Sequence, residues 1–303
     1  MQQNQPPRMQ CFVKRNFSPF FSDQNNPRLA YACKLPPDIV TSHLRVMHAH
    51  QDLTEVLLIY SGDSELLLGG KKHTIRPGDL VIYNPGVVHD EWSWRENGVG
   101  HYCIGVNGLR IPGLRENALI PDGQNCVFPT GDSFEDLCTL FELIYRSLSA
   151  EEPQAELFCD SLTRALLIKA LSVVNGVEAS PIEPPDVLGK RIQEYIDAHY
   201  TEPLTLQNMG DALHISPYYL SHVFKKELGY SPMQYLLRRR IGEAQTLLLA
   251  TSLPVGKISE MVGYDTQSYF NQQFTKQVGV APGRYRQEFT GSKGGSGKAG
   301  DQR

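Results

Sequence analysis

Two histidines and a glutamate stand at a spacing that could serve metal chemistry. His48-Ala49-His50 is followed, after four residues, by Glu55. Residues two apart on a strand point to the same face, so His48 and His50 would present their imidazoles together. Imidazole nitrogens and carboxylate oxygens are ligands for Zn, Mn, Fe and Ni in proteins. The segment therefore indicates either a metal site or a polar pocket lined by one of the histidines.

A second segment extends this pattern along the chain. Six residues separate Glu55 from Gly62, and Gly78 leads through a short apolar run to Pro85-Gly86-Val87-Val88-His89. Together the segments resemble the two sequence motifs of cupin barrels, with proline and glycine adjacent in the second. The resemblance implies a ligand set for a divalent metal, made of His48, His50, Glu55 and His89.

Other side chains of this region could orient an organic effector. A ligand pocket combines apolar walls with a few polar groups, and Trp92 and Trp94 would share one side of a strand. One of them could stack on a sugar or an aromatic ring, or both could belong to the core. The predicted effector-binding residues are Arg45, His50, Tyr60, Tyr83, His89, Trp92 and Trp94.

Strands must position these side chains, and residues 29–129 carry strand signals. Short apolar runs such as Val56-Leu57-Leu58-Ile59-Tyr60 alternate with turn residues, and Gly69-Gly70 marks a hairpin. Many short strands at this spacing predict a β-barrel of the cupin or jelly-roll type. Residues 1–28 are predicted to form an N-terminal arm that precedes this effector-sensing domain.

Two helices should cover the barrel within residues 130–175. An apolar seam with three- and four-residue spacing predicts the first of them. Its members are Phe134, Leu137, Phe141, Ile144 and Leu148. The seam either packs on the barrel or meets its copy in a homodimer, and we predict a helical dimerisation region here. Residues 176–186 are rich in proline and form the predicted linker.

The C-terminal region contains one pattern twice, fifty residues apart. The repeated residues are Tyr219, Phe224, Lys226, Gly229, Pro232 and Tyr235, which recur as Tyr269, Phe274, Lys276, Gly279, Pro282 and Tyr285. Such a repeat indicates two copies of one supersecondary unit. Each copy predicts helix, tight turn and second helix, so residues 187–290 should form an all-α domain of two helix-turn-helix units. Residues 291–303 are predicted to be a disordered tail.

A long helix from Pro232 to about Ala250 should separate the two units. Its roughly 18 residues would span about 27 Å. Recognition helices that enter successive major grooves on one face of DNA lie about 34 Å apart, so the spacer has the right order of length.

The run from Tyr219 to Pro232 resembles the DNA-binding domain of AraC/XylS-type transcriptional regulators, as do Gly263-Tyr264 and Ser268-Tyr269-Phe270. The resemblance implies a double-stranded operator as partner, a homodimer, and RNA polymerase as a further candidate partner. Many such regulators keep the two histidine motifs as fold remnants and bind small molecules without metal. No cofactor is therefore certain, and a divalent metal in the cupin is the alternative to an organic ligand.

Outward residues of each second helix match the positions at which this family contacts bases. They are Tyr218, Ser221, His222 and Lys225 in the first copy and Gln267, Ser268, Asn271 and Gln272 in the second. Amide side chains can pair with adenine edges. Basic residues set affinity and register through phosphate. The predicted phosphate contacts are Lys226, Arg239, Lys276, Arg284 and Arg286, with Arg240 expected in a structural ion pair.

Charge is distributed unevenly between the two halves. The chain has 29 Lys and Arg against 33 Asp and Glu, whereas residues 187–290 have 11 against 9. The C-terminal region is thus the part that could tolerate a polyanion. The sequence has no apolar run of the roughly 20 residues that span a bilayer and no secretory signal. We expect a cytoplasmic protein with no membrane partner.

These observations predict a multidomain α+β protein that is a regulator and not an enzyme. Its cupin-type domain would sense a small molecule, such as a sugar or related metabolite, and control operator binding. The alternative is a metal-dependent cupin enzyme fused to a DNA-binding module. A third hypothesis is regulation without any effector. The sign of regulation, as activator or repressor, is left open.

Overall fold

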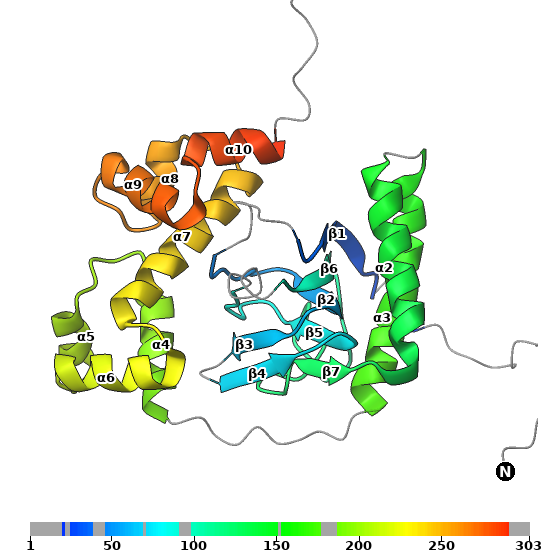
Figure 1. Cartoon of the computed structure of the whole chain (residues 1–303), viewed down its shortest axis with the longest axis horizontal. Helices are drawn as coiled ribbons and strands as arrows, with labels where there is room; N and C mark the ends of the chain where they lie inside the picture. The colour runs from blue at the N-terminus through cyan, green and yellow to red at the C-terminus, as the bar shows by residue number, and fades with distance from the viewer. Residues whose placement is uncertain are drawn as a thin grey trace, which may run out of the picture.

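The computed structural model describes residues 20–21, 25–38, 46–68, 71–90, 98–150, 153–176 and 187–290. Residues 1–19, 177–186 and 291–303, which hold most of the predicted arm, linker and tail, lie outside this set. The described residues form a sheet domain with two long helices and an all-helical C-terminal domain (Figure 1). The predicted fold class is confirmed.

Antiparallel strands build the N-terminal domain. They are β1 (Arg28–Leu35), β2 (Thr54–Ser61), β3 (Ser64–Leu68), β4 (Lys71–Ile75), β5 (Asp79–Tyr83), β6 (Gly100–Asn107) and β7 (Val127–Pro129). Five of them form one sheet in the order β1-β6-β2-β5-β7, and β3 and β4 form a separate two-stranded ribbon. Within the described residues, the strands form two separate open sheets. Among these residues, no continuous ladder of hydrogen bonds closes the sheets into a barrel.

The two faces of the five-stranded sheet have different surroundings. Glu55 lies opposite both Gly105 and Tyr83 in the strand register, so these residues share the face that we call inner. Val56 and Ile104 lie opposite one another on the outer face. Helices α2 (Phe134–Ser149) and α3 (Ala155–Gly176), which follow the short 3-10 helix η1 (Gly131–Ser133), cover the outer face.

The apolar seam of α2 packs inside its own domain. Leu137, Phe141 and Ile144 are buried in the same core as the sheet. These side chains would have to leave that core to meet a second copy, so the seam covers the sheet and is not the dimer contact. The wider expectation that residues 130–175 support a dimer stays a prediction.

Helices fill the C-terminal domain. They are α4 (Val187–His199), α5 (Leu206–Leu213), α6 (Pro217–Leu228), α7 (Pro232–Ala250), α8 (Val255–Met261), α9 (Gln267–Val278) and α10 (Pro282–Thr290). The α5–α6 and α8–α9 units lie along α7, the predicted spacer (Figure 1). No helix in the described part of the chain combines the length and apolar character that a membrane span needs.

The fifty-residue repeat reappears in capping and in burial. Ser216 and Thr266 each accept a hydrogen bond from the third residue of the following helix, which satisfies a free backbone donor. Gly229 and Gly279 end these helices with φ of 78° and 92°, a left-handed conformation that glycine adopts without strain. The buried residues of α6 are Leu220, Phe224 and Leu228, and those of α9 are Phe270, Phe274 and Val278.

Candidate functional site

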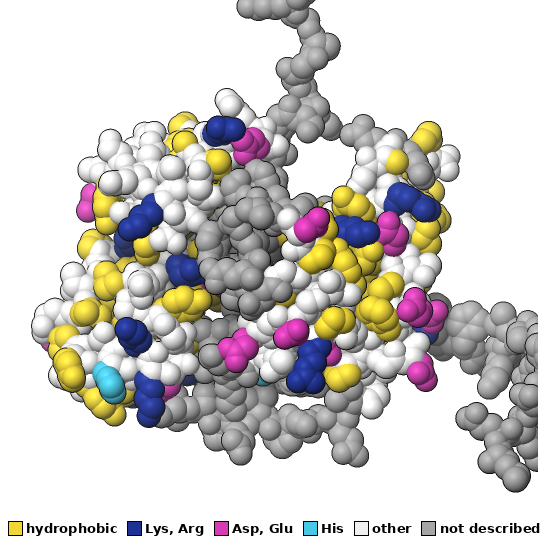
Figure 2. All heavy atoms as spheres, in the orientation of Figure 1, with side chains coloured by type: hydrophobic (Ala, Val, Ile, Leu, Met, Phe, Trp, Pro, Cys, Tyr) yellow, Lys and Arg dark blue, Asp and Glu magenta, His cyan; other side chains and the backbone are white. Residues whose placement is uncertain are grey.

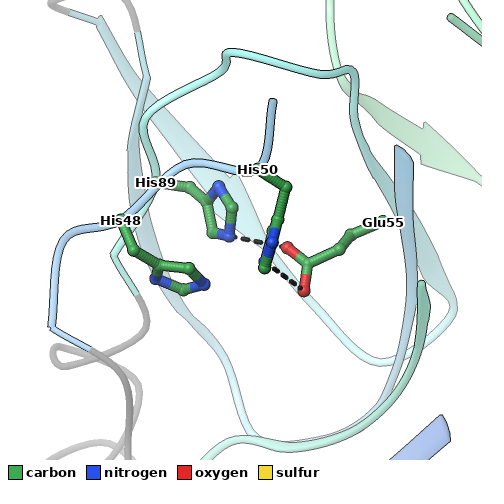
Figure 3. Close-up of side chains that lie close together, drawn as sticks. All are labelled: His48, His50, Glu55 and His89. Carbon is green, nitrogen blue, oxygen red and sulfur yellow. Dashed lines mark ion pairs between the residues drawn. The ribbon is translucent and has the colours of Figure 1, made fainter. Parts of the chain in front are cut away.

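The predicted ligand set comes together on the inner side of the sheet domain. His48 and His50 precede β2, Glu55 lies on β2, and His89 follows β5. One ligand atom from each of the four lies within 4.8 Å of all the others, and the side chains point toward one another (Figure 3). We call these four residues the His/Glu cluster.

Backbone contacts orient two of the imidazoles. The Nδ1 atom of His89 lies 2.9 Å from the carbonyl oxygen of Val87, and that of His48 lies 3.2 Å from the carbonyl oxygen of Val46. A carbonyl oxygen only accepts hydrogen bonds, so each Nδ1 carries the proton and donates it. This arrangement turns Nε2 toward the cluster, as second-sphere carbonyls do for metal-binding histidines.

Glu55 is the anionic centre of the cluster. Its oxygens lie 2.7 Å from Nε2 of His89 and 3.4 Å from Nε2 of His50, and its side chain is only 4% exposed. Burial alone would raise the pKa of this carboxyl, but charge and hydrogen bonds from His89 and His50 hold the pKa well below its ordinary value. Glu55 is therefore an ionised carboxylate surrounded by imidazoles.

Sequence reasoning missed Tyr31 and Cys103 beside this centre. The hydroxyl of Tyr31 on β1 donates to Oε1 of Glu55, and Sγ of Cys103 on β6 lies 3.7 Å from the same oxygen. A side chain at Gly105 would collide with the Tyr31 ring, so glycine is required where that ring crosses β6. These two residues could not be found from the sequence, because nothing in it shows that β1 pairs with β6.

The predicted effector residues divide into separate groups. Arg45, Trp92 and Trp94 lie outside the described residues. Tyr83 is buried and stacks on His89 with ring centroids 4.1 Å apart, so it belongs with the His/Glu cluster.

Tyr60 does not join this group. Its hydroxyl donates to the carbonyl oxygen of Leu35, and its ring lies 5.0 Å from that of Tyr102. Tyr102 in turn stacks on Phe141 of α2, so Tyr60 belongs to the helix-covered side. Tyr60 therefore does not line the inner face, contrary to the prediction. It lies five residues after Glu55 on β2, so strand alternation places it on the outer face with Val56.

A separate cavity lies between α3 and the loop that precedes β7. Its volume is about 590 Å³ and its walls are mostly apolar. The lining includes Phe20, Ile111, Leu114, Leu119, Ile168 and Leu171. None of the predicted effector residues that the structure describes lines this cavity, which could hold an organic molecule away from the His/Glu cluster.

The predicted base-contacting residues lie on outward faces of α6 and α9. Tyr218, at 83% exposure, and His222 and Lys225 are open to solvent on α6, where with Ser221 and Lys226 they line a shallow hollow. Of the predicted residues on α9, Gln267, Ser268 and Gln272 are exposed. Ser221 and Asn271 occupy equivalent positions in the two helices and are both half-buried.

Two tyrosines on these helices were missed as surface residues. Tyr219 is 52% exposed and Tyr269, fifty residues later, is 56% exposed. Both copies place an amphipathic ring beside the predicted DNA-binding face. No signal in the repeat separates these tyrosines from Tyr235 and Tyr285, which also recur and are buried.

One predicted phosphate contact is wrong. Arg239 is only 3% exposed. Its Nη1 donates to Glu243 at 3.0 Å, its Nε lies 3.7 Å from Asp197, and its guanidinium lies 4.5 Å from the ring centre of Tyr200. Arg239 thus lies on the buried face of α7, at the centre of an ion-pair network, and does not reach the surface.

The other basic residues differ in how free they are to reach DNA. Lys226 and Lys276 are exposed, and Arg284 is exposed with Glu288 as its partner. Arg286 donates to the carbonyl oxygens of Leu248 and Leu253, which commits it to the end of α7. Arg240 likewise donates to two backbone carbonyls, in place of the expected ion pair.

Surface charge follows the division between the domains. On the face shown in Figure 2, Lys and Arg side chains are spread over the helical domain, whereas most Asp and Glu side chains lie over the sheet domain and α2–α3. On this face the helical domain carries few acidic side chains, although Lys and Arg side chains also lie over the sheet domain and α2–α3. One chain thus joins two helix-turn-helix units to a domain that contains the His/Glu cluster. This combination defines a transcriptional regulator with a ligand-binding domain and a DNA-binding domain.

Comparison with known proteins agrees with this class. The chain matches the AraC-like ligand binding domain over residues 39–167 and a helix-turn-helix domain over residues 209–288. The HTH-type transcriptional regulator YisR of Bacillus subtilis is 37% identical over 70% of this chain and 78% of its own length. The arabinose operon regulatory protein of Escherichia coli is 27% identical over 72% of this chain and 74% of its own.

Among solved structures, the C-terminal domain of AraT, a response regulator from Geobacillus stearothermophilus, is 42% identical with a TM-score of 0.34. The match covers 36% of this chain and 88% of that chain. The chain belongs to the AraC family of transcriptional regulators. It joins an AraC-like ligand-binding domain to a helix-turn-helix DNA-binding domain, and the relatives named above are regulators.

Proposed function

We propose that α6 and α9 enter successive major grooves of one operator and that a ligand in the N-terminal domain controls this binding. The observation that carries the proposal is the repeat of burial and capping in two helices whose outward residues differ. His222 and Lys225 on α6 face solvent, as do Ser268 and Gln272 on α9. Two helices with the same capping and buried residues but different outward residues would allow one chain to bind an asymmetric DNA sequence.

Selection from a random duplex pool tests this function. Protein-bound duplexes should converge on one sequence with two separated contact blocks, about one helical turn apart. Titration of the selected duplex against a scrambled duplex of the same length then measures specificity at a stated salt concentration. Equal affinity for both would contradict sequence-specific binding. The protein would act where the chromosome lies, in the cytoplasm, with RNA polymerase as a further partner at the promoter.

We propose that a homodimer forms through the outer side of α3. Leu157 and Ile168 are 69% and 48% exposed and lie three turns apart on one helix face, with Phe158 at 45% exposure beside them. A second copy that packs on this face would remove these apolar side chains from water. Sedimentation should show a dimer for the natural chain and a monomer for Leu157→Asp. Met261→Asp is the matched control, since Met261 is 42% exposed but lies in α8.

A metal-dependent enzyme is the second candidate, because the His/Glu cluster offers ligands of the kind that cupin enzymes use. The relatives named above are regulators, so we expect this chain to release its ligand unchanged. Metal-loaded protein incubated with sugars, sugar acids and aromatic acids should therefore return them unaltered. Turnover that disappears in His50→Ala would establish the enzyme instead.

A further inference from the structure

Two cysteines lie opposite one another on neighbouring strands of the sheet domain. Cys33 of β1 is the register partner of Cys103 of β6, and the two strands run antiparallel. Both residues carry thiols in the structure. In the register of the described strands, no other cysteine lies opposite a cysteine. The fold thus brings together two thiols that are far apart in the sequence.

Regular pairing on both sides of Cys33 holds the two cysteines in place. The register is continuous from Tyr31 to Leu35, and the register shift of β1 lies before this run, between Leu29 and Tyr31. Strand β1 is an edge of the five-stranded sheet, and it lies beside β6 (Figure 1). A slip by one residue would turn every side chain of the run to the opposite face. The two thiols therefore stay opposed.

The spacing of such a pair fits a disulfide. Directly opposite residues of antiparallel strands point to the same face, and their Cα atoms lie about 4.5 or 5.5 Å apart, depending on the type of pair. Residues linked by a disulfide have Cα atoms about 4.4–6.8 Å apart, so both types of pair allow the bond. The Cβ atoms need a closer approach, from about 4.5–5.5 Å in an open pair to about 3.5–4.5 Å in the disulfide. Closure must therefore draw β1 and β6 slightly together.

The two cysteines differ in their access to solvent. Cys103 is only 2% exposed, whereas Cys33 is half-buried. A dissolved oxidant therefore meets Cys33 first. An accessible thiol beside a second thiol that can displace its oxidised product is the arrangement that redox-sensing cysteines use.

The pair also lies beside the His/Glu cluster. Sγ of Cys103 lies 3.7 Å from Oε1 of Glu55, the oxygen that accepts the hydrogen bond from Tyr31. Tyr31 precedes Cys33 by two residues, so both side chains are on the inner face of β1. A disulfide would remove the S–H group of Cys103 from the surroundings of Glu55, and it would fix the strand that carries Tyr31 to β6.

We propose that Cys33 and Cys103 form a reversible disulfide when a hydroperoxide oxidises the chain. Sγ of Cys33 attacks one oxygen of the peroxide, the O–O bond breaks, and the other oxygen leaves with the thiol proton as water or an alcohol. Cys33 is then a sulfenic acid. Sγ of Cys103 attacks Sγ of Cys33, the S–O bond breaks, and the hydroxyl group leaves as water with the proton of Cys103. The two thiols lose two electrons, and the peroxide gains them.

The strand geometry also makes this disulfide easy to reduce. Because closure draws the strands together, the bond is strained, and strained disulfides have more oxidising potentials than structural ones. Two molecules of glutathione supply the two electrons and leave as their own disulfide, after attack on the accessible sulfur of Cys33. This inference concerns the ligand-binding domain alone and goes beyond the proposed function, which requires no oxidant. Its failure would leave sequence-specific DNA binding intact.

Peptide mapping of the full chain tests the bond. Reduced protein is freed of reductant, treated with hydrogen peroxide, alkylated, and digested with trypsin without reduction. Residues 29–34 and 96–110 are tryptic peptides that contain one cysteine each. They should appear as one cross-linked species, with the loss of two of the six thiols of the chain. An oxidised chain that keeps six thiols, or one that links other cysteines, overturns the proposal.

Serine variants test the separate roles of the two thiols. Cys103→Ser should stop at the sulfenic acid of Cys33, which the reagent dimedone labels. Cys33→Ser should leave Cys103 unlabelled at the same peroxide dose. Cys138→Ser is the matched control, since Cys138 is a half-buried cysteine in α2 of the same domain, and it should form the cross-link as the natural chain does. Labelling of Cys103 in Cys33→Ser would overturn the assignment of Cys33 as the accessible thiol.

Hydrogen exchange and reduction test the effect of the bond and its reversibility. Exchange of the β1 amides should slow in the oxidised chain and return to its former rate after treatment with reduced glutathione. Exchange in α5, which lies in the other domain, should not change. Unaltered exchange of β1 in the cross-linked chain would contradict the fixing of this strand to β6. A bond that glutathione opens only in denaturant is a structural disulfide and overturns the reversible site.

Discussion

The ring of Tyr31 lies directly across Gly105, and this crossing brings the Tyr31 hydroxyl to Glu55. Gly105→Ala should therefore destabilise the ligand-binding domain by about 1–3 kcal/mol, because the new methyl group forces the ring away. Both tryptophans of the chain lie in the N-terminal half, so their fluorescence during urea unfolding reports on this domain. A loss below about 0.5 kcal/mol, the range of ordinary surface changes, would contradict the steric account.

A double-variant cycle separates this crowding from a general effect of alanine in β6. In the background of Tyr31→Ala there is no ring to displace, so Gly105→Ala should be nearly neutral there. The two substitutions should thus show an interaction energy of about 0.5–3 kcal/mol. Additive effects would mean that the ring contact is not the cause.

The second recognition helix should carry sequence discrimination through its amides. Replacement of Asn271 and Gln272 by alanine should lower the preference for the selected duplex by about 1–3 kcal/mol for each lost base contact. Lys276→Ala is the comparison, since it should weaken binding to all sequences and reduce the salt slope by about 1. Gel-shift titration at several salt concentrations measures both quantities. Unchanged discrimination in the first variant would remove α9 from base contact.

Arg239 should matter for folding and not for phosphate binding. Arg239→Met leaves Asp197 and Glu243 without their shared buried partner, so the C-terminal domain should lose about 3–5 kcal/mol of stability. Arg284→Met, which breaks an exposed pair with Glu288, should cost only about 0–1 kcal/mol. Far-UV circular dichroism during urea unfolding measures the difference. A reduced salt slope with unchanged stability in Arg239→Met would restore the phosphate contact.

The C-terminal domain should lose stability as pH rises from about 4 to above 6. Burial raises the pKa of Asp197 from 3.8 to about 6, despite the opposing charge of Arg239. Between these values the folded domain keeps a proton that the unfolded chain has released, so rising pH favours unfolding. The full effect amounts to about 3 kcal/mol.

Asp197→Asn should remove this dependence. Asp211→Asn is the control, since Asp211 is an exposed carboxylate in the same domain. Urea unfolding at a series of pH values compares the three chains. A pH profile of Asp197→Asn that still falls between about 4 and 6 would assign the effect to another group.

The helical half of the fold could be predicted almost completely from the sequence. Local signals suffice there: Ser216-Pro217 begins α6, Gly229 ends it, and Pro232 begins α7. These caps act within a few residues, so no knowledge of the tertiary structure is needed. The His/Glu cluster was likewise predicted, because its members belong to two short motifs.

Contacts between distant segments could not be predicted in the same way. Tyr31 meets Glu55 because β1 pairs with β6, and strand pairing at that separation leaves no local signal. Arg239 was predicted to be a surface cation because its partner Asp197 lies far from it in the sequence. Arg238 was not selected at all, although its ion pair with Asp90 joins the two domains.

Helix α7 belongs to two packing units at once. Val46, Met47 and Val88 of the sheet domain complete the apolar core that α7 shares with the C-terminal helices. A fragment limited to residues 187–290 would expose that part of the helix, including Gly242, which the backbone of residues 46–47 closely approaches in the whole chain. DNA affinity measured on such a fragment would therefore describe an unrestrained α7, and its difference from the whole chain would give the free energy that the sheet domain contributes.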